Sequence, residues 1–194
     1  MVTRVIGSLL MLATLAASAF ADTYYFGTQP KHTNITFTSE TILETILGNV
    51  NAIQGSATLA EGQYSVKLDV PVDQMKTGIE MRDGHMKSEH WLDVAKYPNI
   101  SFTAKSAKRL DGDKWEVNGD FTMHGITKTR TIVVEATPIP ADKGVKMGAG
   151  QWMRFRTEFP VKLSDHQVKI AAQAEGKVND EWKVKVMLYG TTEP

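Results

Sequence analysis

Met81–Phe102, MRDGHMKSEHWLDVAKYPNISF, interrupts the regular pattern of this chain. On both sides of it apolar and polar residues alternate, which is the period of half-buried β-strands. Within it the alternation stops, and the bulky apolar residues fit a short, imperfect helical face: Met86, Trp91, Leu92 and Val94. Pro98 ends this pattern, and alternation resumes at Ile100. The sequence therefore predicts a short helix over about residues 82–94, lying across one end of a sheet or barrel.

Alternation over the rest of the chain predicts β-strands with one apolar and one polar face. The alternating stretches lie near residues 22–26, 32–39, 56–59, 64–70, 100–104, 115–123, 128–137, 153–159, 168–174 and 182–188. Turn residues separate several of them, as at 111–114, 124–127 and 179–180. Together these stretches indicate roughly eight or nine strands in one domain.

Residues 39–47 fit two interpretations. Their apolar residues have helical spacing, and Ser39 could cap a helix that begins there. Gly48 and Gly55 follow within and beside apolar stretches, where a glycine indicates a bulge or bend of the kind that barrels use at corners.

Short turns between one-sided strands are typical of an up-and-down antiparallel barrel or a sandwich. We favour the barrel, an all-β antiparallel fold of roughly eight strands, because closure protects both edge strands. The interior of such a barrel holds one small ligand or is filled by side chains alone.

Residues 1–21 have the pattern of a secretory signal peptide. Arg4 precedes an apolar run at 5–15 that is too short to span a bilayer, and Ala19-Phe20-Ala21 matches a cleavage site. We expect cleavage after Ala21, with a mature domain over 22–194; a retained membrane anchor is the alternative. The chain contains no cysteine. An exported protein without disulfides fits the bacterial periplasm, where a sufficiently large core is stable alone.

The charge composition excludes some partners. The 22 Lys and Arg residues balance 22 Asp and Glu residues, so there is no basic excess of the kind that nucleic-acid binding requires. Balanced charge also argues against electrostatic adhesion to anionic lipid. We expect no integral membrane segment in the mature chain, and the oligomeric state stays open, a homodimer included.

No arrangement of residues predicts a catalytic or metal site. The five histidines, His32, His85, His90, His124 and His166, lack the spacing of a metal-binding pair. There is no Gly-x-Ser-x-Gly elbow and no phosphate-binding loop. We therefore expect a binding protein without a required cofactor.

Two blocks of sequence resemble the YceI-like family of bacterial periplasmic polyisoprenoid-binding proteins. The first is Met81–Phe102, which is similar to a family pattern R-D-x-H-L-x-S followed by bulky residues, Asp, Tyr-Pro and an apolar-x-Phe, with Met86 in place of the usual Leu. The second is 117–128, VNGDFTMHGITK, which resembles a family hairpin. His32 with Ile35 and Phe37, and the last strand at 178–190, agree with the same pattern.

The resemblance implies a lipocalin-like barrel that binds an amphiphilic lipid, a polyisoprenoid or an isoprenoid quinone, with its tail inside. The residues expected near the ligand are Arg82, His85, Trp91, Phe102, Phe121, Met123, Phe155 and Arg156, with the polar head near Arg82, His85 and Arg156. One departure from the family is Pro160, where Gly is frequent after Phe159, so the turn and the pocket rim there should differ.

Two other functions remain as alternatives. One is an enzyme that processes a small lipid, with His85 or His124 as a base at the mouth of the barrel. The other is a structural or stress protein whose barrel is filled by its own side chains.

Overall fold

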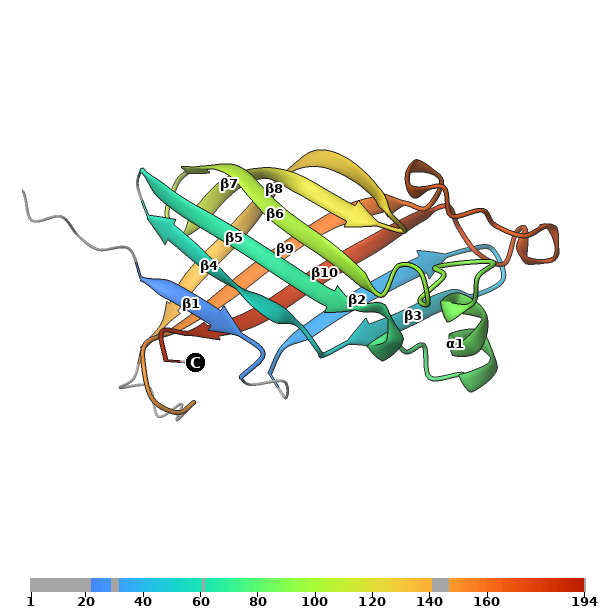
Figure 1. Cartoon of the computed structure of the whole chain (residues 1–194), viewed down its shortest axis with the longest axis horizontal. Coiled ribbons are helices and arrows are strands. Elements are labelled where there is room, and N and C mark those ends of the chain that lie inside the picture. The colour runs from blue at the N-terminus through green and yellow to red at the C-terminus, as the bar shows by residue number, and fades with distance from the viewer. Residues whose placement is uncertain (1–21, 29–31, 61, 141–146, 194) are drawn as a thin grey trace, which may run out of the picture.

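The computed structural model describes residues 22–28, 32–60, 62–140 and 147–193. The predicted signal peptide at 1–21 lies outside the described residues. The rest is an antiparallel sheet that closes into a barrel, as predicted (Figure 1). Its strands are β1 (Thr23–Phe26), β2 (Asn34–Glu40), β3 (Thr45–Val50), β4 (Gln54–Ala60), β5 (Gln63–Pro71), β6 (Asn99–Arg109), β7 (Lys114–Met123), β8 (Ile126–Ile139), β9 (Trp152–Lys162) and β10 (Glu181–Thr191).

These ten strands occupy eight places around the barrel. From β4 to β10 each strand pairs with the next along the chain. On its other edge β10 pairs with β2 along 183–187 and with β1 at Thr191. β1 pairs with β4, and β2 pairs with β3. β1 and β2 therefore share one place in the barrel, β3 and β4 share the next, and these two places close it. The eightfold prediction is therefore confirmed, and its first two places each consist of two short strands.

Glycines allow close approach where the interrupted strands meet the interior. Gly55 has φ +139°, and a Cβ there would lie 2.0 Å from the Lys67 carbonyl oxygen on β5. At Gly48 on β3 a Cβ would lie 2.1 Å from the ring of Phe37, which stacks on Trp182 with ring centroids 5.0 Å apart. The expected bulge is absent from the ladders at both glycines, which instead allow close packing between neighbouring strands.

The predicted helix is present and shorter than expected. Helix α1 (Glu80–Lys87) ends at Ser88, whose backbone is extended. The chain then continues in hydrogen-bonded turns, in which Leu92 N–H donates to the Met86 carbonyl and Tyr97 N–H to the Asp93 carbonyl. Figure 1 shows α1 at one end of the barrel, opposite the C-terminus. Among the described residues, no helix has the length and apolarity that a bilayer span requires.

Two stretches differ from an expectation drawn from apolar spacing. Residues 39–47 form the β2–β3 hairpin and not a helix, because the Thr41 hydroxyl accepts from the Leu43 and Glu44 N–H groups and fixes a tight turn. Residues 168–174 form no strand. They belong to an excursion between β9 and β10 that contains the 3-10 turns η3 (Ser164–His166) and η4 (Ala172–Ala174). The alternation there was misleading because only Val168 of its apolar residues is buried.

Candidate functional site

The barrel interior at the α1 end contains an apolar cavity. The volume of this cavity is about 120 Å³. Every strand from β2 to β10 except β4 contributes to its lining, together with the connection from β5 to β6. The side chains that line it include Phe37, Val70, Leu92, Phe121, Met123, Phe159, Leu163 and Trp182. Ser101 and Thr157 are the polar residues that border it.

A smaller cavity continues the space toward the other end of the barrel. Its volume is about 50 Å³. The residues that line it include Phe26, Ala57, Val117 and Phe155. The two cavities share five lining residues, Leu68, Phe102, Ile132, Thr157 and Val186. These five residues form a waist, which divides one apolar interior into two chambers.

The connection from β5 to β6 caps the larger chamber. Met75, Met86 and Leu92 of this connection are buried, and Met75 and Leu92 border the cavity. Two backbone hydrogen bonds between Asn49 and Lys76, of 2.8 and 2.9 Å, join this cap to β3. The cap is therefore an integral wall of the chamber.

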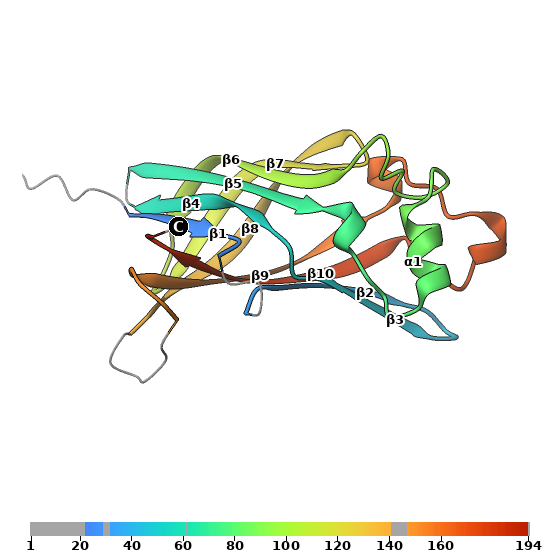
Figure 2. The same cartoon turned by 60° about the horizontal axis from the view of Figure 1, so that its bottom comes forward.

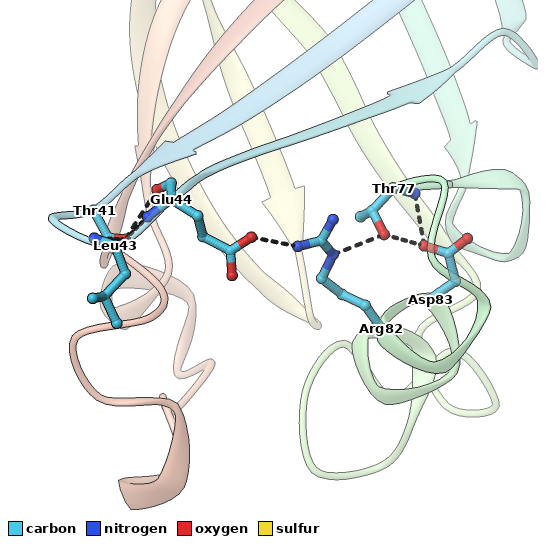
Figure 3. Close-up of polar contacts among 6 residues, drawn as sticks. All are labelled: Thr41, Leu43, Glu44, Thr77, Arg82 and Asp83. Atoms are coloured by element: carbon cyan, nitrogen blue, oxygen red, sulfur yellow. Dashed lines mark hydrogen bonds and ion pairs between the residues drawn. The ribbon is translucent and has the colours of Figure 1, made fainter.

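A polar clasp joins α1 to Thr77, which precedes it in the same connection, and to Glu44 at the β2–β3 turn (Figure 3). One Asp83 carboxylate oxygen accepts from both the N–H and the hydroxyl of Thr77, each at 2.6 Å. Arg82 Nε donates to the same hydroxyl at 3.1 Å, and Arg82 Nη1 lies 3.2 Å from the Glu44 carboxylate. Burial alone would raise the pKa of Asp83, but the hydrogen bonds from Thr77, with Lys87 and Arg82 nearby, hold it below its usual range.

The backbone pairing between β8 and β9 is incomplete near the α1 end. The two strands pair only from Glu135 to Ile139 of β8, opposite 152–156 of β9. In the described structure residues 126–134 pair with β7 alone, and residues 157–162 pair with β10 alone. Figure 2 shows β8 diverging from β9 toward the α1 end. We call this unpaired stretch the seam.

The side chain of Arg130 occupies the seam. Its guanidinium lies over the rings of Phe121 on β7 and Phe159 on β9, 5.2 and 4.9 Å from their centroids. Both rings also border the larger chamber. Burial lowers the pKa of Arg130, and the negative charge of Asp165 partly opposes this by raising it. One terminal nitrogen, Nη1, is buried and has no hydrogen-bond partner among the described residues.

Two histidines fix the η3 turn over the same end of the seam. His166 is buried, its Nδ1 lies 3.0 Å from the Ile126 carbonyl oxygen, and its ring packs edge-on against Phe121. His124 Nδ1 lies 3.1 Å from the His166 carbonyl oxygen, and its ring packs against Tyr97. None of the five histidines borders either chamber in the part of the chain that the structure describes.

The structure separates the predicted ligand residues into four groups. Phe102, Phe121 and Met123 border the larger chamber, and Phe155 borders the smaller one. Trp91 packs on the core near the cap, and its Nε1 is buried without a partner among the described residues. Arg82 is held in the clasp.

The remaining two predicted residues, His85 and Arg156, are exposed. Arg156 alternates with the inward-facing Phe155 and borders a polar hollow beside Glu158 and Lys185, although some of its atoms also border the smaller chamber. The role of each of the eight residues in binding remains a prediction.

Sequence reasoning missed Arg130 and Thr157. Arg130 lies two residues before Ile132 and four before Val134, both of which face the interior. Because side chains on one face of a strand recur every second residue, this spacing is the sequence signal that Arg130 also faces inward. Thr157 has the corresponding phase on β9, between Phe155 and Phe159, and its hydroxyl is buried without a partner among the described residues.

This arrangement is suited to holding an apolar chain. The chambers offer apolar side chains along the barrel axis, and polar groups gather at the seam and the clasp. Among the described residues, no group of three or more His, Cys, Asp or Glu side chains is placed to hold a metal ion.

Comparison with known proteins gives consistent matches. The family model described as "YceI-like domain" matches residues 26–189. Protein YceI of Escherichia coli O157:H7 is 30% identical over 158 residues, which cover 79% of this chain and 80% of that protein. A UPF0312 protein of Pectobacterium carotovorum subsp. carotovorum is 29% identical over 167 residues, with 81% of each chain covered.

Solved structures show the same fold. BcnA of Burkholderia cenocepacia has a TM-score of 0.70 at 20% identity, covering 84% of this chain and 98% of that one. A polyisoprenoid binding domain from Saccharophagus degradans, implicated in plant cell wall breakdown, has a TM-score of 0.62 at 12% identity and covers 88% and 98%. At these identities the likeness supports the fold alone.

Proposed function

Because this chain belongs to the YceI-like family, we propose that it is a lipid-binding barrel that encloses the apolar tail of an amphiphilic lipid. The ligand class is a polyisoprenoid or an isoprenoid quinone. After removal of residues 1–21 the protein acts in the bacterial periplasm as a carrier and catalyses no reaction. The single observation that carries this proposal is the apolar interior, with its two chambers in line along the barrel.

The energetics favour a long apolar tail. Each CH₂ group that leaves water for this interior contributes about 0.8 kcal/mol. The larger chamber, at about 120 Å³, is smaller than a cavity of about 150 Å³ that accepts a benzene-sized guest. A long tail therefore enters only if waist side chains such as Phe102 rotate, and tail burial supplies the free energy for that rearrangement.

Lipid extraction tests the proposal. The protein is purified from the periplasm of its native host without detergent, extracted with organic solvent and examined by mass spectrometry. We expect isoprenoid lipid at about one molecule per chain, and none from the same protein refolded from denaturant without lipid. Recovery of a folded protein free of lipid, which also binds no added isoprenoid, would contradict lipid binding.

Cell fractionation tests the location separately. We expect the protein in the periplasmic fraction, with Asp22 as its first residue by N-terminal sequencing. A protein that keeps residues 1–21 and sediments with membranes would instead support a retained anchor.

A further inference from the structure

We propose that Arg130 binds the anionic head of the lipid whose tail occupies the chambers, and that the seam between β8 and β9 is the head-group site. This inference rests on the proposed function. It assigns the polar end of the ligand to one residue and predicts that the barrel distinguishes amphiphiles by the charge of their head.

The register of β8 orients Arg130 toward the interior. Side chains on one face of a strand recur every second residue. Ile132 and Val134 on β8 border the chambers, and Arg130 has their phase. Its partner across the ladder is Gly119 on β7, which has no side chain to block the guanidinium. Arg130 is not among the residues that line the two chambers, and its charge lies over the rings of Phe121 and Phe159, which line the larger one.

The guanidinium is held in position but its charge is not neutralised. In the described part of the chain no carboxylate lies within 4.0 Å of it and none of its nitrogens forms a hydrogen bond. The rings of Phe121 and Phe159 contact its flat face. A buried polar group without a partner is costly in a folded protein, so an unpaired buried Nη1 calls for an acceptor.

Planar contact of this kind leaves the edge of the guanidinium free. Arginine N–H groups in a rigid fork match the oxygens of phosphate and carboxylate, with two parallel hydrogen bonds. Among the described residues, Asp165 and His166 are the titratable groups that interact electrostatically with Arg130. Asp165 lies beyond ion-pair distance, and burial keeps His166 in its neutral form more readily than an exposed histidine, so one positive charge faces the site.

The seam is a break in the backbone ladder beside residues of the larger chamber. The side chains that border the larger chamber are apolar apart from Thr157 and Ser101. Between β8 and β9 the ladder is open for residues 126–134, and the Arg130 side chain spans the opening from one strand to a ring of the other. A polar head placed there leaves its tail in the apolar chamber.

Ligands with one tail and different heads test this assignment. The probes are farnesyl phosphate, farnesoic acid and farnesol, added to the mature protein after its own lipid has been removed. Trp182 borders the larger chamber, so its fluorescence reports occupancy, and calorimetry gives the dissociation constants. The variants are Arg130→Met, Arg130→Lys and a control, Arg109→Met, which removes an exposed arginine lying 6.0 Å from the Trp115 ring centroid.

We expect the wild-type protein to bind an anionic probe about 10- to 100-fold more tightly than farnesol, which is the range that a charge-assisted hydrogen bond supplies. Arg130→Met should lose this preference and keep its affinity for farnesol. Arg130→Lys should keep part of it, and Arg109→Met all of it. The phosphate and carboxylate probes then show which anionic head fits better.

Three results would overturn the assignment. The preference for anionic probes could survive in Arg130→Met, or Arg130→Met could weaken all three probes equally, which would indicate a structural role. The wild-type protein could also bind farnesol and the anionic probes equally, which would remove head-group selection but leave lipid binding intact. Failure of the folded wild-type protein to bind any of the three would reject the proposed function as well.

Discussion

At the scale of single residues, His166 shows how burial changes a titratable group. Its ring packs against Phe121. In the neutral tautomer that carries a proton on Nδ1, this nitrogen donates a hydrogen bond to the Ile126 carbonyl oxygen. Burial is the main cause that lowers its pKa, and the positive charge of Arg130 acts in the same direction. The hydrogen bond to Ile126 and the charge of Asp165 oppose these effects without cancelling them.

This lowered pKa predicts an acid-dependent loss of stability. The unfolded chain takes up a proton at His166 near pH 6.5, whereas the folded chain takes it up only at lower pH. Stability therefore falls as the pH decreases from about 6.5 to the folded pKa, with a slope of at most about 1.4 kcal/mol per pH unit. His166→Phe should remove this component. Urea unfolding of both proteins from pH 8 to pH 5 measures it.

The free-energy difference between wild type and His166→Phe should be constant above pH 7 and should shift in favour of the variant below it. A difference that stays flat down to pH 5 would show that His166 titrates equally in both states, contrary to its burial.

The polar residues of the interior explain why the site was only partly predictable. Phe102, Phe121 and Met123 could be assigned to the chambers because apolar alternation places them inward. An arginine at an inward position contradicts that rule, so a pattern of polarity assigns Arg130 outward. Only its phase with Ile132 and Val134 shows the true direction, and the neighbouring Val133 obscures that phase.

At the scale of elements, the clasp compensates for a helix that is weak by itself. Helix α1 has eight residues, which is below the length at which isolated helices are stable in water. Its first residues also lack a side-chain cap. Asp83, with Thr77 and Arg82, therefore supplies hydrogen bonds that hold α1 against the segment before it, as Figure 3 shows.

Removing the Asp83 carboxylate should loosen this cap. In Asp83→Ala the Thr77 N–H and hydroxyl lose their acceptor, which should destabilise the protein by about 0.5–1.5 kcal/mol at pH 7. Because the pKa of Asp83 is lowered in the folded state, its contribution is present above the ordinary pKa of 3.8 and disappears as the pH falls through the folded value.

Hydrogen exchange measures the effect locally. The Thr77 and Lys76 amides should exchange faster in Asp83→Ala, while amides in β7 keep their wild-type protection. The matched control is Asp73→Ala, which removes an exposed carboxylate from the same connection. Equal effects of the two substitutions would show that Asp83 does not act through its hydrogen bonds with Thr77.

The elements differ in how well their sequence determines them. Strands such as β5, β7 and β10 follow from alternation because one face is buried and the other exposed. In the turn at 41–44, Ile42 and Leu43 are apolar but exposed, so their helical spacing carries no information about burial. The breaks between β1 and β2 and between β3 and β4 depend on contacts between distant segments, such as Tyr25 with Thr191. Local spacing in the sequence does not encode such contacts.

At the scale of the whole molecule, the two chambers lie in line, and the waist decides whether a tail can use both. On β9 the interior positions run from Phe155 in the smaller chamber to Val161 in the larger one. These six residue steps span about 20 Å at about 3.3 Å per residue. A short tail needs less of this length, whereas a long tail must pass the waist between Phe102 and Val186.

Narrowing the waist should therefore discriminate between tails by length. Val186 is partly buried on β10 and borders both chambers, so Val186→Phe places a ring between them. We expect this variant to bind the long polyprenol solanesol at least about tenfold more weakly than wild type, because excluding two CH₂ groups already costs about 1.6 kcal/mol. Farnesol, whose tail is much shorter, should lose less.

The control is Lys185→Phe, which adds the same ring to the exposed face of the same strand. Overpacking in Val186→Phe can itself cost about 1–3 kcal/mol of stability, so both variants are compared by their unfolding midpoints before binding is measured. The ratio of the two affinities then separates the causes, because general destabilisation weakens both ligands alike. An unchanged ratio in a folded Val186→Phe would mean that tails remain in one chamber and that the interior does not act as a single channel.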